Sequence, residues 1–126
     1  MILGVGIDVV EVARVRAAHR RFGRPFLQRL LRPAEVDYCL AHQSPALQAA
    51  ARLAAKEAVA KAFGVGVGRQ LGWQDIEVVR EATGQPKVLL HGPGLRLLRR
   101  CRAAHVHLSL THTAHYAAAV AIVERA

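Results

Sequence analysis

Three charged side chains in this sequence have types that could serve phosphate chemistry: Asp8, Glu57 and Lys61, with Lys56 directly before Glu57 in the same cluster of charges. Glu57 and Lys61 are four residues apart in the stretch AAKEAVAKAFG, so on a helix they lie on one face. Asp8 comes from a separate segment near the N-terminus. Two carboxylates from different segments form a donor set for a hard cation such as magnesium, which takes its remaining ligands from water and substrate phosphates. A lysine beside them would neutralise phosphate charge.

The helical pair also has an ordinary structural explanation. A glutamate four residues before a lysine forms a surface ion pair worth about 0.2–0.5 kcal/mol, and most such pairs are simply solvated. Asp8 is harder to explain in this way. A carboxylate on a strand face that otherwise carries glycine needs a cation, a hydrogen-bonding network or water. Taken alone, the residues leave both interpretations open.

The segment that carries Asp8 has the alternation of a strand over residues 2–9. One face is apolar and consists of Leu3, Val5, Ile7 and Val9. The opposite face holds Gly4, Gly6 and Asp8. Because glycine has no side chain, this second face allows a ligand or another backbone to approach closely.

Helical patterns fill the first half of the chain after this strand. From residue 11 to about residue 24, Val12, Val15, His19 and Phe22 recur at helical spacing, with arginines on the other side. A second helix is expected over 31–42, entered at Pro33. The third, over 44–64, carries Glu57 and Lys61, with Ser44 as N-cap and Gly64 as the C-terminal stop.

The second half of the chain favours strands. Residues 64–72 form a glycine-rich loop, and two strands are expected at 75–81 and 86–91. A short basic helix over 92–104 precedes a final hairpin built from 105–113 and 115–124. This order predicts one domain over residues 1–126 of the α+β class, with an antiparallel sheet and helices packed on one face.

Composition narrows the class of protein and of partner. The 126 residues include 18 basic and 9 acidic side chains, a net charge of +9 that indicates an anionic partner. Nucleic acid, an acidic protein and a phosphate-rich small molecule all fit that charge. The N-terminus has no basic leader, and no apolar run is long enough to span a membrane, so we expect a cytoplasmic protein without a membrane partner. Cys39 and Cys101 are expected to be reduced.

Four other interpretations fit the sequence less well. Of the histidines near the last hairpin only His105 and His107 share a strand face, which disfavours a zinc site. The glycines of GVGVG do not follow a strand and open a helix, as a dinucleotide fingerprint would. A nucleic-acid module would need aromatics for stacking, whereas Phe22, Phe26 and Phe63 occupy core-like helical positions. We therefore expect no nucleic-acid partner. A purely structural oligomer would leave Asp8 unexplained.

Four stretches, taken in order, resemble the holo-acyl-carrier-protein synthases, the short 4′-phosphopantetheinyl transferases. They are GVGIDVVEVARV, RLAAKEAVAKAFGVGVG, ATGQPKVLLHG and HLSLTHTAHYAAAVAIVE, and together they run along nearly the whole chain. The resemblance implies a 4′-phosphopantetheinyl transferase-like fold. It also implies transfer of the phosphopantetheine arm from coenzyme A to a serine of apo acyl carrier protein, with release of 3′,5′-ADP, in support of fatty acid biosynthesis. Polyketide or peptide carriers remain alternative acceptors.

The resemblance also assigns roles to residues. It implies that Asp8 and Glu57 hold Mg²⁺ on the pyrophosphate and that Lys61 meets phosphate oxygens, with Glu57 and Lys61 as the catalytic pair. The coenzyme A contacts that it implies are Arg52, Lys61, Gly84, Gln85, Pro86, Thr111 and His112. Members of this family often carry an aromatic residue where this chain has Leu53. That difference puts an aromatic contact there in doubt and leaves the metal site intact.

Two interfaces are implied by the same resemblance. The chain is expected to form a homotrimer with active sites between subunits, and the strand at 115–124 agrees because it is apolar on both faces. Acyl carrier protein is expected to dock on the basic side of the first helix. The docking residues are Arg14, Arg20, Arg21 and Arg24, with Phe26 as an apolar anchor. Arginines crowded on one helix side repel each other, which favours an anionic partner.

Overall fold

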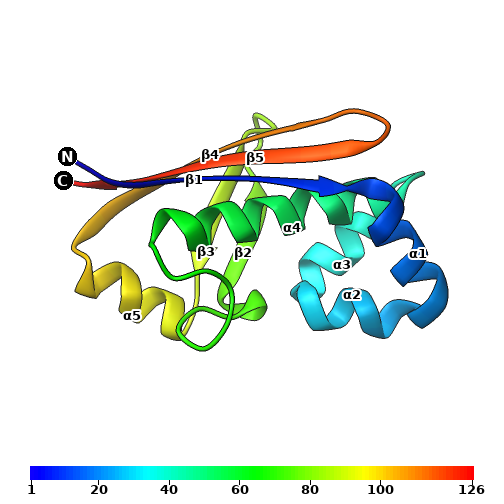
Figure 1. Cartoon of the computed structure of the whole chain (residues 1–126), viewed down its shortest axis with the longest axis horizontal. Coiled ribbons are helices and arrows are strands. Elements are labelled where there is room, and N and C mark those ends of the chain that lie inside the picture. The colour runs from blue at the N-terminus through cyan, green and yellow to red at the C-terminus, as the bar shows by residue number, and fades with distance from the viewer.

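A three-stranded antiparallel sheet with one long helix across it organises the fold (Figure 1). The computed structural model describes all residues, 1–126. Its elements in chain order are β1 (Ile2–Glu11), α1 (Val12–Phe22), α2 (Arg24–Leu30), α3 (Pro33–Leu40), α4 (Pro45–Ala62), the 3₁₀ helix η1 (Trp73–Asp75), β2 (Ile76–Arg80), β3 (Pro86–Leu90), α5 (Pro93–Arg100), β4 (Ala103–His112) and β5 (Tyr116–Arg125). No helix is both long and apolar enough to span a bilayer.

The main sheet has the order β1-β5-β4, so the last strand of the chain lies in the centre. Strands β2 and β3 form a separate two-stranded sheet. Helix α4 packs on one face of the main sheet, as Figure 1 shows. The predicted α+β class, with an antiparallel sheet covered by helices on one face, is confirmed.

Helix α4 begins and ends where its sequence predicts. Ser44 is the N-cap and Pro45 the first helical residue, where a missing backbone N–H costs nothing. The helix ends before Gly64, which adopts the left-handed conformation with φ of +78°. The N–H of Val65 then turns back to the carbonyl of Ala60 at 3.1 Å. This hydrogen bond satisfies a carbonyl at the helix end. The defined end of α4 in turn fixes the positions of Glu57 and Lys61.

The glycine face of β1 lies directly on α4. A Cβ at Gly6 would collide with the carbonyl oxygen of Ala58, and one at Gly4 would collide with that of Ala62. The close approach that the glycines predicted is therefore made by another backbone. Asp8 continues the same face of β1, so its carboxylate is brought to the side of α4.

The apolar face of β1 is exposed in the single chain from Val5 onwards. Leu3, which was predicted to lie on the same face, packs instead against the inner cluster, because the strand register shifts between Ile2 and Gly4. Val5, Ile7 and Val9 are 58%, 65% and 59% exposed. On β5 the neighbouring residues of this outer face, Ala118, Val120 and Ile122, are only half-buried. The outer surface formed by β1 and β5 is thus apolar and has no helix over it, whereas β4 adds the polar residues His107, Ser109 and Thr111 to this face.

The core consists of two buried clusters. The first lies between the sheet, the C-terminal half of α4, β2 and α5, and the second between α1, α2, α3 and the N-terminal half of α4. Helix α4 contributes to both clusters, which explains why 13 of its residues are buried. Cys39 and Cys101 are free thiols, and burial raises the pKa of Cys39 to about 11.

The N-terminal helices differ from the expected pattern. The chain breaks at Gly23, where φ is +69°, and a separate helix α2 follows that the sequence reasoning did not anticipate. Phe22 is 58% exposed, with the Arg21 guanidinium 5.1 Å from the centre of its ring. The assignment of Phe22 to a core-like position is wrong. Phe26 and Phe63 are half-buried.

Candidate active site

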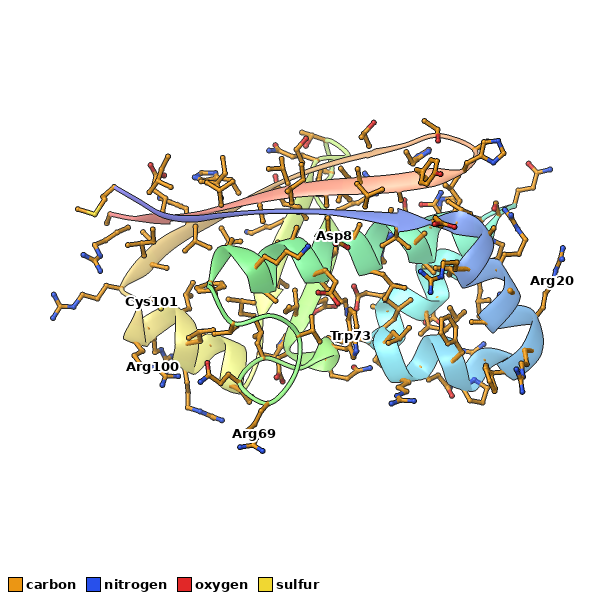
Figure 2. The ribbon with its side chains drawn as sticks, in the orientation of Figure 1. Asp8, Arg20, Arg69, Trp73, Arg100 and Cys101 are labelled. Carbon is orange, nitrogen blue, oxygen red and sulfur yellow. The ribbon has the colours of Figure 1, made fainter.

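Strand β1 and helix α4 bring Asp8, Glu57 and Lys61 together. The Nζ atom of Lys61 donates a hydrogen bond to Oδ1 of Asp8 at 3.0 Å and another to the carbonyl of Ile7 at 3.1 Å. Asp8 projects from β1 towards α4, as Figure 2 shows. Its side chain is 18% exposed, whereas that of Lys61 is 50% exposed. A ligand can therefore reach this pair from solvent.

Glu57 lies close enough to this pair to interact with it electrostatically. Burial raises the pKa of the Glu57 carboxyl, the Asp8 carboxylate raises it further, and Lys61 opposes both effects. The two carboxylates thus repel each other when both are ionised, and Lys61 partly compensates this repulsion. The surface-pair interpretation of Glu57 and Lys61 is incomplete, because the hydrogen bonds of Lys61 go to Ile7 and Asp8 of β1.

This donor set fits a divalent magnesium ion. Two half-buried carboxylates that repel each other gain from a cation of charge two, and oxygen ligands are those that Mg²⁺ prefers. No group of three or more histidine, cysteine, aspartate or glutamate side chains gathers anywhere in the chain. A cation held at Asp8 and Glu57 would need further oxygen ligands from water or from a phosphate substrate.

A second region gathers most of the residues predicted to contact coenzyme A. A groove of about 560 Å³ lies between the β2–β3 turn, the end of β4 and α4. Its lining consists of Ala51, Arg80, Gln85, Pro86, Leu108, Ser109, Leu110, Thr111 and His112. Gly84 precedes this lining in the turn, with φ of +87°, a conformation that glycine adopts readily. Four separated residues of the prediction, Gln85, Pro86, Thr111 and His112, thus share one groove.

The carboxylate pair and this groove lie on opposite sides of the central strand. Asp8 is in register with Ala119 of β5, and Ala119 is in register with Leu110 of β4 on its other side. Asp8 is therefore on one outer strand, while Thr111 and His112 are on the other. Within one chain, β5 stands between the two sets.

Arg52 and Lys56 lie beneath the surface. Arg52 is 2% exposed and does not line the groove, and Lys56 is fully buried. The ammonium of Lys56 donates to Glu35 Oε1 at 2.8 Å and to the carbonyls of Leu30 and Trp73, each at 2.9 Å. Burial lowers the pKa of Lys56, and Glu35 counteracts that effect. Lys56 therefore has a structural position, although it directly precedes Glu57 in the sequence.

Sequence reasoning missed Glu35, Arg80 and Ser109. Glu35 falls within the helix expected over 31–42 and was given no role there, yet it is 1% exposed and is the counter-charge of Lys56. Arg80 lines the groove but lies outside the four stretches of the resemblance, and Ser109 lies within the last of them but was given no role. A signal for Glu35 was available, since the alanines around Lys56 place its ammonium in a buried layer that requires an acid.

The residues predicted to dock acyl carrier protein are grouped around α1 and α2. Arg14, Arg20 and Arg21 are exposed on α1. Arg24 begins α2, and its Nη2 atom lies 3.6 Å from Oδ1 of Asp37. Figure 2 shows Arg20 at the α1 end of the molecule, Arg100 towards the opposite end and Arg69 at the lower edge between them. Beside these arginines the exposed ring of Phe22 offers more apolar surface than the half-buried Phe26.

Comparisons with known proteins agree with one another. Residues 4–121 match the sequence model of the 4′-phosphopantetheinyl transferase superfamily. The chain is 43% identical over 120 residues to a holo-acyl-carrier-protein synthase of Chlorobaculum parvum, covering 95% of this chain and 97% of the relative. It is 48% identical over 122 residues to the synthase of Moorella thermoacetica, covering 97% and 94%.

Solved structures give the same result. The crystal structure of the synthase from Neisseria meningitidis matches with a TM-score of 0.92 and 30% identity, covering 99% of this chain and 100% of that one. The synthase of Helicobacter pylori in complex with coenzyme A matches with a TM-score of 0.85 and 31% identity, covering 95% and 99%.

Proposed function

The chain belongs to the 4′-phosphopantetheinyl transferase superfamily, and we infer that it moves the 4′-phosphopantetheine arm of coenzyme A to apo acyl carrier protein. The acceptor is a serine hydroxyl of the carrier, and 3′,5′-ADP is the leaving group. Both the relatives' name and the coenzyme A complex of a structural neighbour support this reaction. The carrier is proposed to serve fatty acid biosynthesis, and the cytoplasm is the proposed location.

Asp8 and Glu57 are proposed to hold Mg²⁺, for which their repulsion and their oxygen donors provide the support. When bound, the ion neutralises charge on the pyrophosphate that is being cleaved. Asp8 contributes from the rigid β1 backbone packed on α4, and Glu57 from the helix itself. The two carboxylates are therefore fixed relative to each other by the contact of Gly4 and Gly6 with α4.

Lys61 is proposed to stabilise the developing charge on the leaving phosphate. Its ammonium lies on Asp8 in this structure, and half of its side chain is exposed, so rotation of the side chain brings it to a phosphate oxygen. An interaction that strengthens as the pyrophosphate breaks accelerates the reaction more than it tightens binding.

Glu57 is proposed to have a second role towards the serine proton. Its raised pKa makes the ionised carboxylate a stronger proton acceptor than an ordinary glutamate. It accepts the proton directly or orients a water that does so.

The groove beside β4 is the proposed site of the nucleotide of coenzyme A. Gln85, Pro86, Thr111 and His112 line it, and Gly84 shapes the turn at its wall. Arg52 lies beneath this wall and is proposed to act on the nucleotide from there. Because β5 separates the groove from Asp8 within one chain, we propose that each active site combines the groove of one subunit with Asp8 of another in a homotrimer.

The apolar outer face of the sheet supports this assembly. Monomeric proteins seldom expose a contiguous apolar surface, and Val5, Ile7 and Val9 would be buried between subunits. The exposed arginines of α1 and α2 are proposed to dock the acidic surface of acyl carrier protein, with Phe26 and Phe22 as apolar contacts.

The pairing of Asp8, Glu57 and Lys61 across β1 and α4 is the observation that carries this function. The test incubates the chain with coenzyme A, Mg²⁺ and apo acyl carrier protein and then measures the mass of the carrier. A gain of one phosphopantetheine group, lost when Mg²⁺ is chelated, is the expected result. An unchanged carrier in the presence of Mg²⁺ contradicts the proposed function.

A further inference from the structure

Glu35 is a fully buried carboxylate to which the reaction described above assigns no role. It comes from α3 and meets two other elements at once. Its Oε1 accepts hydrogen bonds from Lys56 Nζ at 2.8 Å and from its own N-cap backbone, the N–H of Arg32, at 2.9 Å. Its Oε2 accepts the backbone N–H of Val78 in β2 at 3.0 Å. One carboxylate thus ties α4 to the edge of the β2–β3 sheet.

This edge of β2 has no third strand beside it. The sheet consists of β2 and β3 alone, with Val78 in register with Val88. An unpaired strand N–H that is buried must find another acceptor. Glu35 provides this acceptor. Because the same carboxylate also binds Lys56 of α4, it sets the distance between β2 and α4.

Arg52 continues the connection from Glu35 towards the groove. Its Nε lies 4.0 Å from Glu35 Oε2 and is buried without a hydrogen-bond partner. Its guanidinium carbon lies 4.0 Å from the centre of the Tyr38 ring. Glu35 and Tyr38 are one turn apart on α3, so the Glu35 carboxylate and the Tyr38 ring both lie beside the guanidinium of Arg52.

Tyr38 in turn contacts the wall of the groove. The guanidinium carbon of Arg80 lies 5.7 Å from the same ring centre, within the range of a cation–π interaction. Arg80 lines the groove, and its Nη1 donates to the carbonyl of Gly84 at 2.8 Å. A column of four side chains, Glu35, Arg52, Tyr38 and Arg80, therefore runs from the buried carboxylate to the β2–β3 turn.

We propose that Glu35 is a positioning residue of the coenzyme A groove, which holds the β2–β3 turn against α4 through the Val78 N–H and through this column. The proposal rests on the proposed function, because it concerns the site of the same nucleotide. Glu35 itself touches no substrate. Its effect reaches the nucleotide through the turn that contains Gly84, Gln85 and Pro86.

The two variants that test this role are Glu35→Gln and Tyr38→Leu. A glutamine cannot accept hydrogen bonds at both ends, so it loses either Lys56 or Val78 and leaves two buried cations without a counter-charge. We expect Glu35→Gln to raise the KM for coenzyme A and the Kd for 3′,5′-ADP about tenfold, the effect of one lost charge-assisted bond. Tyr38→Leu should raise both about fivefold.

Other kinetic parameters separate positioning from general instability. Turnover at saturating coenzyme A and the KM for the carrier should change less than about threefold, whereas loss of folded enzyme lowers turnover and leaves KM unchanged. The double variant should resemble the more affected single variant, because both changes break one column. Glu77→Gln is the control: it alters a half-buried carboxylate of β2, beside Val78. Glu77 is bonded to His91 and lies 3.8 Å from Arg32 Nε, but it accepts no hydrogen bond from the N–H of Val78 and belongs to no part of the column, so coenzyme A binding should remain unchanged.

The outcomes are distinguishable. A wild-type chain that transfers no phosphopantetheine group contradicts the proposed function. An active wild type with unchanged 3′,5′-ADP affinity in both variants overturns the role of Glu35. If Glu35→Gln does not fold, Tyr38→Leu decides the matter alone, and unchanged affinity in that variant overturns the proposal. Calorimetry with 3′,5′-ADP provides the measurement, and thermal unfolding verifies that each variant is folded.

Discussion

The ammonium of Lys61 lies 3.0 Å from Oδ1 of Asp8, which joins residues that are 53 positions apart in the chain. Helix α4 presents this lysine to β1 because Gly4 and Gly6 allow the two backbones to touch. Glu57, one turn earlier on α4, faces the same carboxylate and raises the local density of negative charge. The predictions below follow from this arrangement and from the surfaces around it.

Asp8→Ala and Glu57→Ala should each abolish phosphopantetheine transfer while the fold survives. Removal of either carboxylate halves the protein's ligands for Mg²⁺, and we expect transfer to fall by about a thousandfold or more. Mass spectrometry of the carrier measures the activity, and circular dichroism establishes the fold. Near-normal turnover of Glu57→Ala with Mg²⁺ present would show that the metal assignment is wrong.

Lys61→Ala should reduce turnover more than it weakens coenzyme A binding. Its charge matters most as the pyrophosphate breaks, so we expect turnover to fall about a hundredfold and the Kd for coenzyme A to change only a few-fold. Single-turnover kinetics and calorimetry measure the two quantities. A pure binding defect, with normal turnover at saturation, would give Lys61 a positioning role instead.

Glu57→Gln should make the chain more stable while it destroys activity. The pKa of Glu57 is raised in the folded chain, so its protonated form favours folding, and this stability is lost as pH rises through the raised pKa. At neutral pH the ionised carboxylate therefore lowers stability, and the glutamine removes this effect. Thermal unfolding should show a higher Tm for the variant at neutral pH and a smaller difference below about pH 4. An equal or lower Tm at neutral pH would contradict the repulsion between Asp8 and Glu57.

Ile7→Asp should prevent assembly of the homotrimer. Ile7 is 65% exposed in the centre of the apolar face, so a charge there would be buried between subunits. Sedimentation should then give a monomer with little activity, whereas the control Gln70→Asp, in an exposed loop, should remain assembled and active. Mixing Asp8→Ala with His112→Ala chains should restore some activity, because mixed trimers regain intact sites. An active monomer of the wild-type chain would refute the shared site.

Arg14→Glu with Arg21→Glu should raise the KM for the carrier and leave that for coenzyme A nearly unchanged. Surface charges act mainly on the encounter rate, so rising salt should produce the same effect in the wild type. Arg99→Glu with Arg100→Glu on α5 is the matched control, since it changes the net charge equally at the opposite end of the molecule (Figure 1). Equal effects of both double variants would show that net charge, and not docking on α1, governs the reaction. Tighter binding of duplex DNA than of the carrier would instead favour the nucleic-acid interpretation.

Local sequence signals determined most elements of this fold. Serine, proline and glycine at the ends of α4 set its bounds, and the alternation of residues 4–9 gave β1 its two faces, whereas the register shift that turns Leu3 inward left no signal. The break at Gly23 was missed because the arginine-rich pattern continues across it and only its φ of +69° interrupts the helix. The order of the strands β1-β5-β4 also required the tertiary structure, since pairing over 100 residues leaves no local signal.

In the candidate site, too, some features follow from the sequence and others only from the tertiary structure. The sequence determined which side chains are suited to phosphate chemistry. Asp8 and Glu57 supply carboxylates for a cation, and Lys61 supplies an ammonium group for phosphate charge. Only the tertiary structure decided that Lys61 meets Asp8 while Lys56 meets the buried Glu35. The reason is geometric: helix positions five residues apart differ by about 140° in direction, so neighbouring elements determine which lysine is exposed and which is buried. Glu35 acquired its place in the same way, through contacts of α3 with α4 and β2 that no spacing along the chain encodes.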